Sequence, residues 1–210
     1  MGSLKRATIG GSAGLGEGAV VQAPMEAQVA RASATSYNGP AAKGADAMSV
    51  QRHIEGYGVG GDAGRALWFL GGLVTWKAVG ADTGGAYELV EQVGAAGYAA
   101  PLHTHARETE GFYVVEGELT MTIGDLSFRA GPGAFGYVPV GVAHAFRVES
   151  ETAKFLTFVT PPGMEGYFED LGAEALTRTL PPAGLIVPDD ARIQEIAAKY
   201  GTRLLGSPPA

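Results

Sequence analysis

Hydrophobic and polar residues alternate along the middle of the chain, from about residue 63 to residue 160. The clearest run covers residues 118–123, where every second side chain is apolar, and residues 87–93 repeat the pattern in part. Alternation with a period of two is typical of strands that bury one face. Several short strands at this spacing predict an all-β barrel or jelly roll.

Glycine and proline residues separate the predicted strands. Gly71 and Gly72 divide the apolar stretch 66–76 into a pair of strands, and Gly124-Asp125 predicts a tight hairpin turn. A second turn is expected where Gly and Pro follow one another at residues 131–133. Further strands are expected at residues 111–116, 126–129 and 155–159, the last of these being the final strand.

The two ends of the chain differ from this middle part. Residues 1–61 are rich in Ala, Gly and Ser, and we expect a partly mobile extension because they bury little apolar surface. The alternative is that residues 19–21 or 49–54 add a strand to the barrel or to a partner subunit. Residues 62–162 are expected to form the barrel, and residues 163–210 a C-terminal segment.

Two helices are predicted after the barrel. A short one lies within residues 162–171 and ends at Gly172. A longer one covers residues 189–200 and is capped by Asp189 or Asp190. Its apolar stripe is expected to pack on the barrel exterior or on a second subunit, and consists of Ile193, Ile196, Ala197 and Tyr200.

Composition excludes several classes of function. A net charge of -7 over 210 residues argues against a nucleic-acid surface, which needs clustered Lys and Arg. The chain has no cysteine, so disulfides and zinc–thiolate sites are excluded and a metal must bind to His, Asp or Glu. No apolar stretch is long enough to span a bilayer and no targeting signal stands out, so we expect a cytoplasmic protein without nucleic-acid or membrane partners.

The sequence offers four histidines as metal ligands: His53, His103, His105 and His144. His103 and His105 are two residues apart, so on a strand both point to the same face. Glu110 follows after a short turn, and His144 comes from a different strand. Three imidazoles and one carboxylate converging inside a barrel would suit Fe, Mn, Co, Ni, Cu or Zn. His53 lies outside the β region and is expected to be a bystander.

Each of these residues also has a plainer interpretation. A single barrel histidine is more often a hydrogen-bonded core residue than a ligand, and Glu108 or Glu110 taken alone would be a surface charge. Glu108 is also the alternative carboxylate ligand, although its spacing from His105 is shorter. Together the residues are more specific than each one alone, because the glycines and the proline around them also stand at defined spacings.

Two segments of the chain resemble the two sequence motifs of the cupin superfamily. Residues 97–117 resemble the first motif, whose expected positions hold Gly97, His103, His105, Glu110 and Gly117. Residues 133–148 resemble the second, with matches at Gly133, Pro139, Gly141 and His144. Val148 stands where that motif usually has an Asn that does not bind the metal. The resemblance implies a cupin double-stranded β-helix with one divalent transition metal per chain, held by His103, His105, Glu110 and His144.

A wider resemblance concerns one group within the superfamily. Residues 66–76, 82–91 and 163–172 look like the monocupin relatives of bacterial quercetinase. This implies a dioxygenase that uses O2 to open the heterocycle of a flavonol, or of a similar enolic or phenolic aromatic, with release of carbon monoxide. Glu110 would then be both a metal ligand and the general base that takes the substrate proton.

A small apolar or aromatic substrate needs an apolar pocket. Strand parity suggests these wall residues: Phe112, Val114, Met121, Phe135, Tyr137 and Phe146. The alternative for each is that it only fills the barrel. Two other functions stay open, namely a cupin isomerase, cyclase or decarboxylase that uses the metal without O2, for example on a polyketide, and a non-catalytic small-molecule binding protein. The resemblance also implies a homodimer formed through edge strands and terminal segments.

Overall fold

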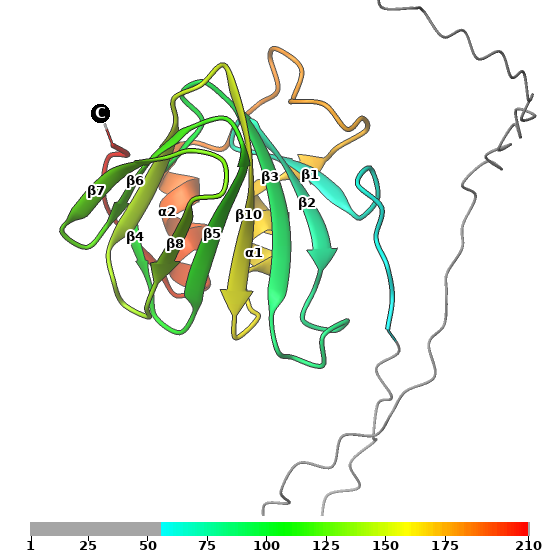
Figure 1. Ribbon diagram of the computed structural model, residues 1–210, viewed down its shortest axis with the longest axis horizontal. Coiled ribbons are helices and arrows are strands. Elements are labelled where there is room, and N and C mark those ends of the chain that lie inside the picture. The colour runs from blue at the N-terminus through cyan, green and yellow to red at the C-terminus, as the bar shows by residue number, and fades with distance from the viewer. Residues whose placement is uncertain (1–55, 210) are drawn as a thin grey trace, which may run out of the picture.

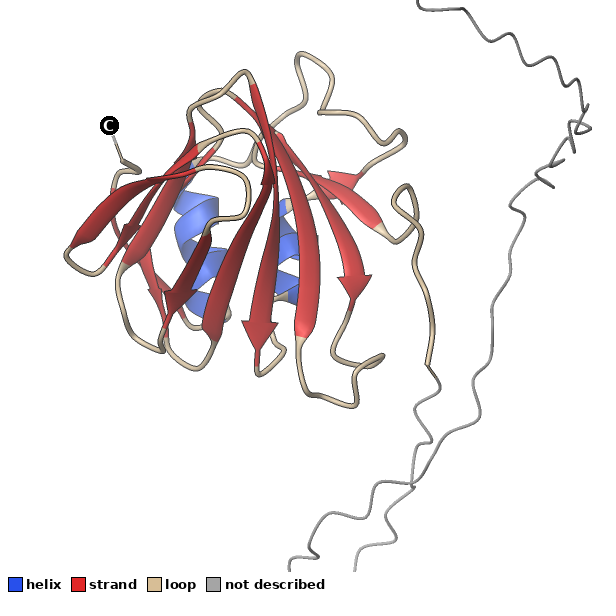
Figure 2. Cartoon of the chain, in the orientation of Figure 1, coloured by secondary structure: helices blue, strands red, loops and turns tan. Residues whose placement is uncertain are grey.

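The computed structural model describes residues 56–209. The predictions for residues 1–55, including the two alternative strands and His53, lie outside this range. Strands dominate the described part, and two helices accompany them (Figures 1 and 2). The strands are β1 (Ala66–Phe69), β2 (Gly72–Ala78), β3 (Glu88–Ala95), β4 (Ala99–His105), β5 (Thr109–Glu116), β6 (Leu119–Ile123), β7 (Leu126–Ala130), β8 (Phe135–Val138), β9 (His144–Val148), β10 (Thr152–Thr160), β11 (Ala173–Glu174) and β12 (Thr202–Gly206). The helices are α1 (Glu165–Leu171) and α2 (Asp190–Lys199).

The strands form two antiparallel sheets. The larger has seven strands in the order β11-β1-β2-β3-β10-β5-β8, and the smaller has five in the order β12-β4-β9-β6-β7. Neighbours in a sheet are often distant in sequence, since β10 lies between β3 and β5 and β9 lies between β4 and β6. This arrangement confirms the predicted jelly-roll barrel.

The predicted turns are present where glycine was expected. Gly71 has a φ of 97° and allows β1 and β2 to pair as a hairpin, with Leu70 beside it at a φ of 48°. Gly124 has a φ of 57° between β6 and β7. A positive φ is easily adopted by glycine, so these residues fix where the chain reverses.

The core of the barrel lies between the two sheets. Phe155, Val114 and Leu119 have no exposed surface and Met121 is 2% exposed, so alternate residues of β10, β5 and β6 point inward as the pattern predicted. Burying large side chains of this kind supplies most of the stability of such a fold, at roughly 1.5–3 kcal/mol for each.

Both helices pack on the inner side of the larger sheet, beside the barrel core. Phe168 and Leu171 of α1 and Ile196 of α2 share one buried cluster with side chains of β1, β2, β3 and β10. Asp189 caps α2 by accepting a hydrogen bond from the backbone N–H of Arg192, so the predicted helix is confirmed and it packs on its own chain. Neither helix of the described residues is long and apolar enough to cross a membrane. The homodimer stays a prediction.

The expectation that residues 155–159 form the final strand is wrong. Two later strands join the sheets: β11 pairs with β1, and β12 pairs with β4, placing Thr202 opposite His105. β11 has only two residues, which is too short for a pattern. In β12 only Thr202 is buried, so this strand has no apolar buried face that alternation could reveal. Pairing with a distant partner, and not a local pattern, produces these strands.

Candidate metal centre

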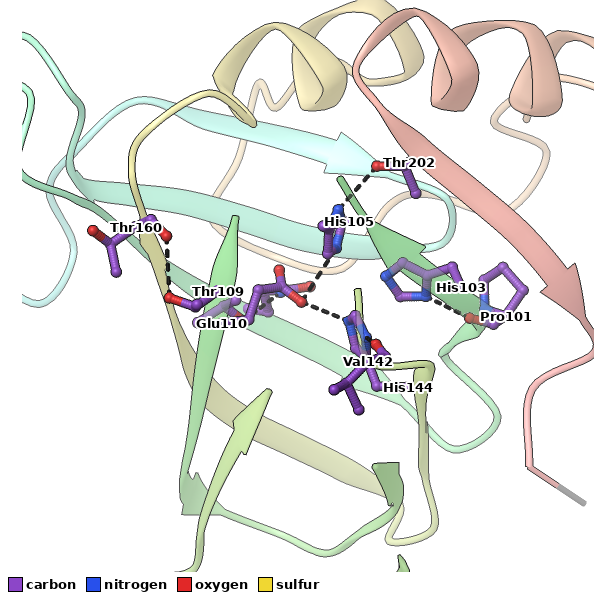
Figure 3. A network of polar contacts seen from close by, with 11 residues as sticks. Pro101, His103, His105, Thr109, Glu110, Val142, His144, Thr160 and Thr202 are labelled. Atoms are coloured by element: carbon purple, nitrogen blue, oxygen red, sulfur yellow. Dashed lines mark hydrogen bonds and ion pairs between the residues drawn. The ribbon is translucent and has the colours of Figure 1, made fainter. Parts of the chain in front are cut away.

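Four side chains converge inside the barrel at one end of the smaller sheet. His103 and His105 come from β4, Glu110 from β5 and His144 from β9, and one ligand atom from each lies within 4.8 Å of those of the others. Figure 3 shows the four side chains pointing toward one another. His103 is opposite His144 in the pairing of β4 with β9, so the sheet itself brings the two motifs together.

The backbone sets the orientation of two imidazoles. The Nδ1 atom of His103 lies 2.7 Å from the carbonyl oxygen of Pro101, and that of His144 lies 3.0 Å from the carbonyl oxygen of Val142. A carbonyl oxygen only accepts hydrogen bonds, so Nδ1 must carry the proton in both rings. Each ring therefore directs Nε2 at the centre, and this is the nitrogen that can bind a metal.

The third imidazole is held by a side chain from the C-terminal segment. The Nδ1 atom of His105 lies 3.0 Å from the hydroxyl oxygen of Thr202 on β12 (Figure 3). His105 and Thr202 are 2% and 4% exposed, so this hydrogen bond is shielded from water. No local sequence pattern indicates this partner, because it lies 97 residues away.

Glu110 brings a negative charge to the centre. Its Oε2 atom lies 2.7 Å from Nε2 of His144 and 3.4 Å from Nε2 of His105. Burial alone would raise the pKa of Glu110, but the close imidazoles of His105 and His144 outweigh it and hold that pKa well below its usual range. Because a carboxylate oxygen and a ring lone pair repel each other at 2.7 Å, a proton or a metal cation must lie between them.

The pKa values of His103 and His105 are shifted in opposite directions. Burial, and next the neighbouring His144, lowers the pKa of His103 to about 4, so this ring is neutral at pH 7. Burial also acts to lower the pKa of His105, but the contacts with Glu110 and the charge of Glu108 raise it overall. His103 is thus a neutral nitrogen ligand, whereas at His105 a metal must compete with a proton.

These residues fit a divalent transition metal. The Nε2 atom of His105 is buried and has no hydrogen-bond partner among residues 56–209, and an unpartnered buried nitrogen is costly unless something else binds it. Three imidazoles and one carboxylate form a borderline donor set that accepts several metals. His103, His105, Glu110 and His144 would hold the ion.

Glu108 lies outside this cluster. It is 3% exposed, its Oε1 atom is 3.1 Å from the guanidinium of Arg107, and it packs beside Gly163. Residues 108 and 110 point in the same direction on a regular strand, but β5 begins only at Thr109, so the turn before it directs Glu108 away. The structure thus places Glu110, and not the alternative carboxylate, with the histidines.

A cavity of about 60 Å³ adjoins the ligands. His103, His105 and Glu110 form part of its wall, and the remainder is mostly apolar. Its other wall residues come from both sheets and from the C-terminal segment, and they are Phe69, Leu70, Gln92, Tyr98, Ala99, Ala100, Pro101, Phe112, Phe146, Met164, Tyr167, Phe168, Thr202 and Leu204.

The residues expected to form the pocket divide into three groups. Phe112 and Phe146 line the cavity. Val114 and Met121 are buried in the barrel core but do not line it. The expectation is wrong for Phe135 and Tyr137, which are 61% and 57% exposed on the outer face of β8.

The error at β8 arises from its register. Gly136 and Val138 are the buried residues of this strand, and Val138 is paired with Glu110. Side chains on either side of a buried residue must point outward. The strand has only four residues, two of them aromatic on the exposed face, so apolar character alone predicts the wrong face.

Several wall residues were not predicted from the sequence. Met164, Tyr167 and Phe168 lie in or next to α1, within the stretch 163–172 that carried the wider resemblance, and Leu204 lies on β12. That resemblance was the one available signal, since nothing in the local pattern indicates that α1 covers a cavity.

Glu88 attaches α1 to the barrel. It is 1% exposed on the inner face of β3, and its Oε1 atom accepts a hydrogen bond of 2.9 Å from the backbone N–H of Gly163. Burial raises the pKa of Glu88, and the N–H groups of Gly163, Glu165 and Met164 counteract this only in part. The start of α1 is therefore tied to a strand of the larger sheet, which fixes the helix over the cavity.

Replacement of Thr202 by valine is expected to weaken metal binding about tenfold to a hundredfold. Valine keeps the shape of threonine but cannot hold Nδ1 of His105, and loss of such an outer partner typically costs this much. Competition for Co²⁺ with a chromophoric chelator measures the change. Thr109→Val is a matched control, because the hydroxyl of Thr109 donates to the carbonyl oxygen of Thr160 and does not contact a ligand. Equal affinities for the two variants would contradict the role of Thr202.

Comparisons with known proteins agree with this site. Residues 90–159 match the family model of the cupin domain, a range that contains all four cluster residues. Quercetin 2,3-dioxygenase of Bacillus subtilis is 32% identical over 91 residues, which are 43% of this chain and 27% of that protein. An uncharacterised protein of Streptomyces coelicolor is 38% identical over 58 residues, which are 28% of this chain and 54% of that protein.

Among solved structures, an RmlC-like cupin from Shewanella frigidimarina has a TM-score of 0.40 and 21% identity, covering 47% of this chain and 82% of that one. The chain matches about a quarter and about half of the lengths of the two curated relatives. The matched motif region and the jelly-roll barrel show that residues 90–159 form a cupin domain. Within the cupin superfamily the chain resembles quercetin 2,3-dioxygenase.

Proposed function

We propose that this protein is a metal-dependent cupin dioxygenase acting on a small enolic or phenolic substrate. The observation that carries the proposal is the buried cluster of three histidines and Glu110, which faces an apolar cavity with aromatic walls. Similarity to a quercetin 2,3-dioxygenase over the cupin region supports an oxygen-dependent reaction. Glu110 is the proposed catalytic residue.

Each side chain of the site has a separate role in the proposed reaction. A divalent cation, when bound, supplies Lewis acidity that lowers the pKa of an enol or phenol. Glu110 accepts the proton of the substrate hydroxyl, and His144, whose Nε2 lies 2.7 Å away, can share it. Phe112 and Phe146, which are 3% and 6% exposed, position a planar ring and exclude water from the electron-rich anion that O2 attacks.

The size of the cavity restricts the substrate. A volume of about 60 Å³ holds about four to six water molecules, whereas pockets for drug-sized ligands measure about 300–1,000 Å³. A guest with a single ring is therefore the nearest in size, although a cavity that holds benzene measures about 150 Å³ and some wall residues must move even for this guest. A three-ring flavonol requires a larger movement, and the part of the wall outside the strands consists of α1 residues with Leu70, Tyr98 and Met164.

The same volume favours a second candidate function. A cavity this small has little room for O2 beside the substrate, and Lewis-acid chemistry without O2 needs none. The second candidate is therefore a cupin isomerase, cyclase or decarboxylase that acts on a small substrate through the same four ligands.

Oxygen uptake distinguishes the two candidates. Protein loaded separately with Fe²⁺, Mn²⁺, Co²⁺ and Ni²⁺ is mixed in air with a flavonol and with the single-ring enol 3-hydroxy-4-pyranone. We expect oxygen uptake with carbon monoxide release, faster with the single-ring compound, and its loss in Glu110→Gln. No uptake with any of the four metals would remove the dioxygenase and leave the second candidate.

A further inference from the structure

Tyr167 brings a phenol side chain to the wall of the metal cavity. It lies on α1 and lines the cavity together with Glu110. Its ring is held edge-on by Phe69 at a centroid distance of 5.6 Å, by Phe168 at 5.8 Å and by Tyr200 at 6.3 Å. Three aromatic neighbours from β1, α1 and the end of α2 therefore fix the plane of the ring and the direction of its hydroxyl.

The other polar groups of the cavity wall are already engaged. The hydroxyl of Tyr98 donates to Oε1 of Gln92 at 3.0 Å, and Nε2 of Gln92 donates to Thr157 at 2.8 Å. Thr202 is bound to His105. The hydroxyl of Tyr167, in contrast, has no hydrogen-bond partner among residues 56–209, and Tyr167 lines a largely apolar cavity. A polar group held in this way is available to a ligand.

The hydroxyl of Tyr167 is a donor. Burial, and next the negative charge of Glu110, raises the pKa of Tyr167 to about 12, so the phenol keeps its proton at neutral pH. Tyr167 and Glu110 also line the same cavity. A ligand in this cavity can therefore be bound from two sides.

We propose that Tyr167 donates a hydrogen bond to a second oxygen of the substrate, next to the oxygen that the metal centre binds. This rests on the proposed function and narrows the substrate class to small rings with two oxygen substituents, such as a catechol or a hydroxy-ketone. A substrate with one oxygen leaves the hydroxyl of Tyr167 unpaired in an apolar wall, which disfavours it. Tyr167 is thus a specificity-determining residue.

The test compares catechol with phenol, which differ by one hydroxyl. Each is titrated into Co²⁺-loaded protein while the visible cobalt spectrum is recorded, so the readout is binding and not turnover. We expect Tyr167→Phe to weaken catechol binding about fivefold to tenfold and to change phenol binding less than about twofold. The cobalt spectrum without probe shows that the variant retains the metal centre.

Tyr200→Phe is the matched control. Tyr200 packs against Tyr167, but its hydroxyl donates to Asp170 at 3.0 Å and it does not line the cavity. We expect this variant to keep the preference for catechol.

Two outcomes would overturn the role of Tyr167 alone: wild-type protein binds catechol and Tyr167→Phe binds it equally well, or the variant loses catechol and phenol to the same extent. If the wild-type protein binds neither probe, the proposed function fails together with this inference.

Discussion

Alanine in place of Glu110 is expected to weaken divalent metal binding by more than about a hundredfold, beyond the range for loss of an outer hydrogen-bond partner. Glu110 supplies the single negative charge of the cluster, and its Oε2 atom contacts both His144 and His105. Without it, three neutral imidazoles must hold a dication inside a barrel with no charge to compensate it. Isothermal titration with Co²⁺ and Ni²⁺ measures the loss.

Glu108→Ala provides the control for this result. Glu108 is also a buried carboxylate, two residues earlier in the chain, but it pairs with Arg107 and lies outside the cluster. We expect the Glu108→Ala variant to retain metal affinity within about threefold. It should lose some stability, because the buried carboxylate beside Gly163 is removed. Metal binding that survives in Glu110→Ala and fails in Glu108→Ala would show that the carboxylate ligand had been assigned to the wrong residue.

Alanine in place of Gly94 is expected to lower the free energy of unfolding by about 3 kcal/mol, at the upper end of the usual cost of overpacking. A Cβ atom on residue 94 would lie 2.5 Å from Cγ and 2.6 Å from Cβ of Tyr98. The ring cannot retreat, since a Cβ on Gly72 would also lie 2.6 Å from its Cζ and its hydroxyl is bound to Gln92. Urea denaturation followed by tryptophan fluorescence measures the change.

Gly131→Ala is the control for Gly94→Ala. A methyl group on Gly131 would have no atom within 4 Å, and this residue does not have a positive φ, so we expect a change within about 0.5 kcal/mol. Because Tyr98 also lines the metal cavity, Gly94→Ala is further expected to weaken the binding of catechol while the four ligands stay in place. A stability equal to that of Gly131→Ala would contradict the packing described for Tyr98.

The barrel could be predicted from local patterns, and the ligand cluster from these patterns together with the resemblance to the cupin motifs. Alternation identified the inward residues of β6, and glycine positions identified the turns around β2 and β7. His103 and His105 could be assigned to one face because a strand has a period of two, and the motif spacing then selected Glu110 over Glu108. Each of these inferences needs only residues close together in the sequence.

Local patterns failed where the face of a strand depends on its partners. β8 is short, and its aromatic residues Phe135 and Tyr137 favour a buried position, yet the pairing with β5 puts Gly136 and Val138 inside. In the same way β12 was missed, because it becomes a strand only by pairing with β4. Non-local pairing, and not propensity, decided both.

The sequence by itself indicated a β-barrel, because strand periodicity is a local property, and its resemblance to the two cupin motifs implied which residues converge at the candidate metal centre. Only the tertiary structure decided what surrounds that centre. Thr202 reaches His105 from β12, Tyr167 reaches the cavity from α1, and Tyr98 fills the space above two glycines. These contacts join residues far apart in the chain, and whether they form depends on the packing of both sheets and both helices at once.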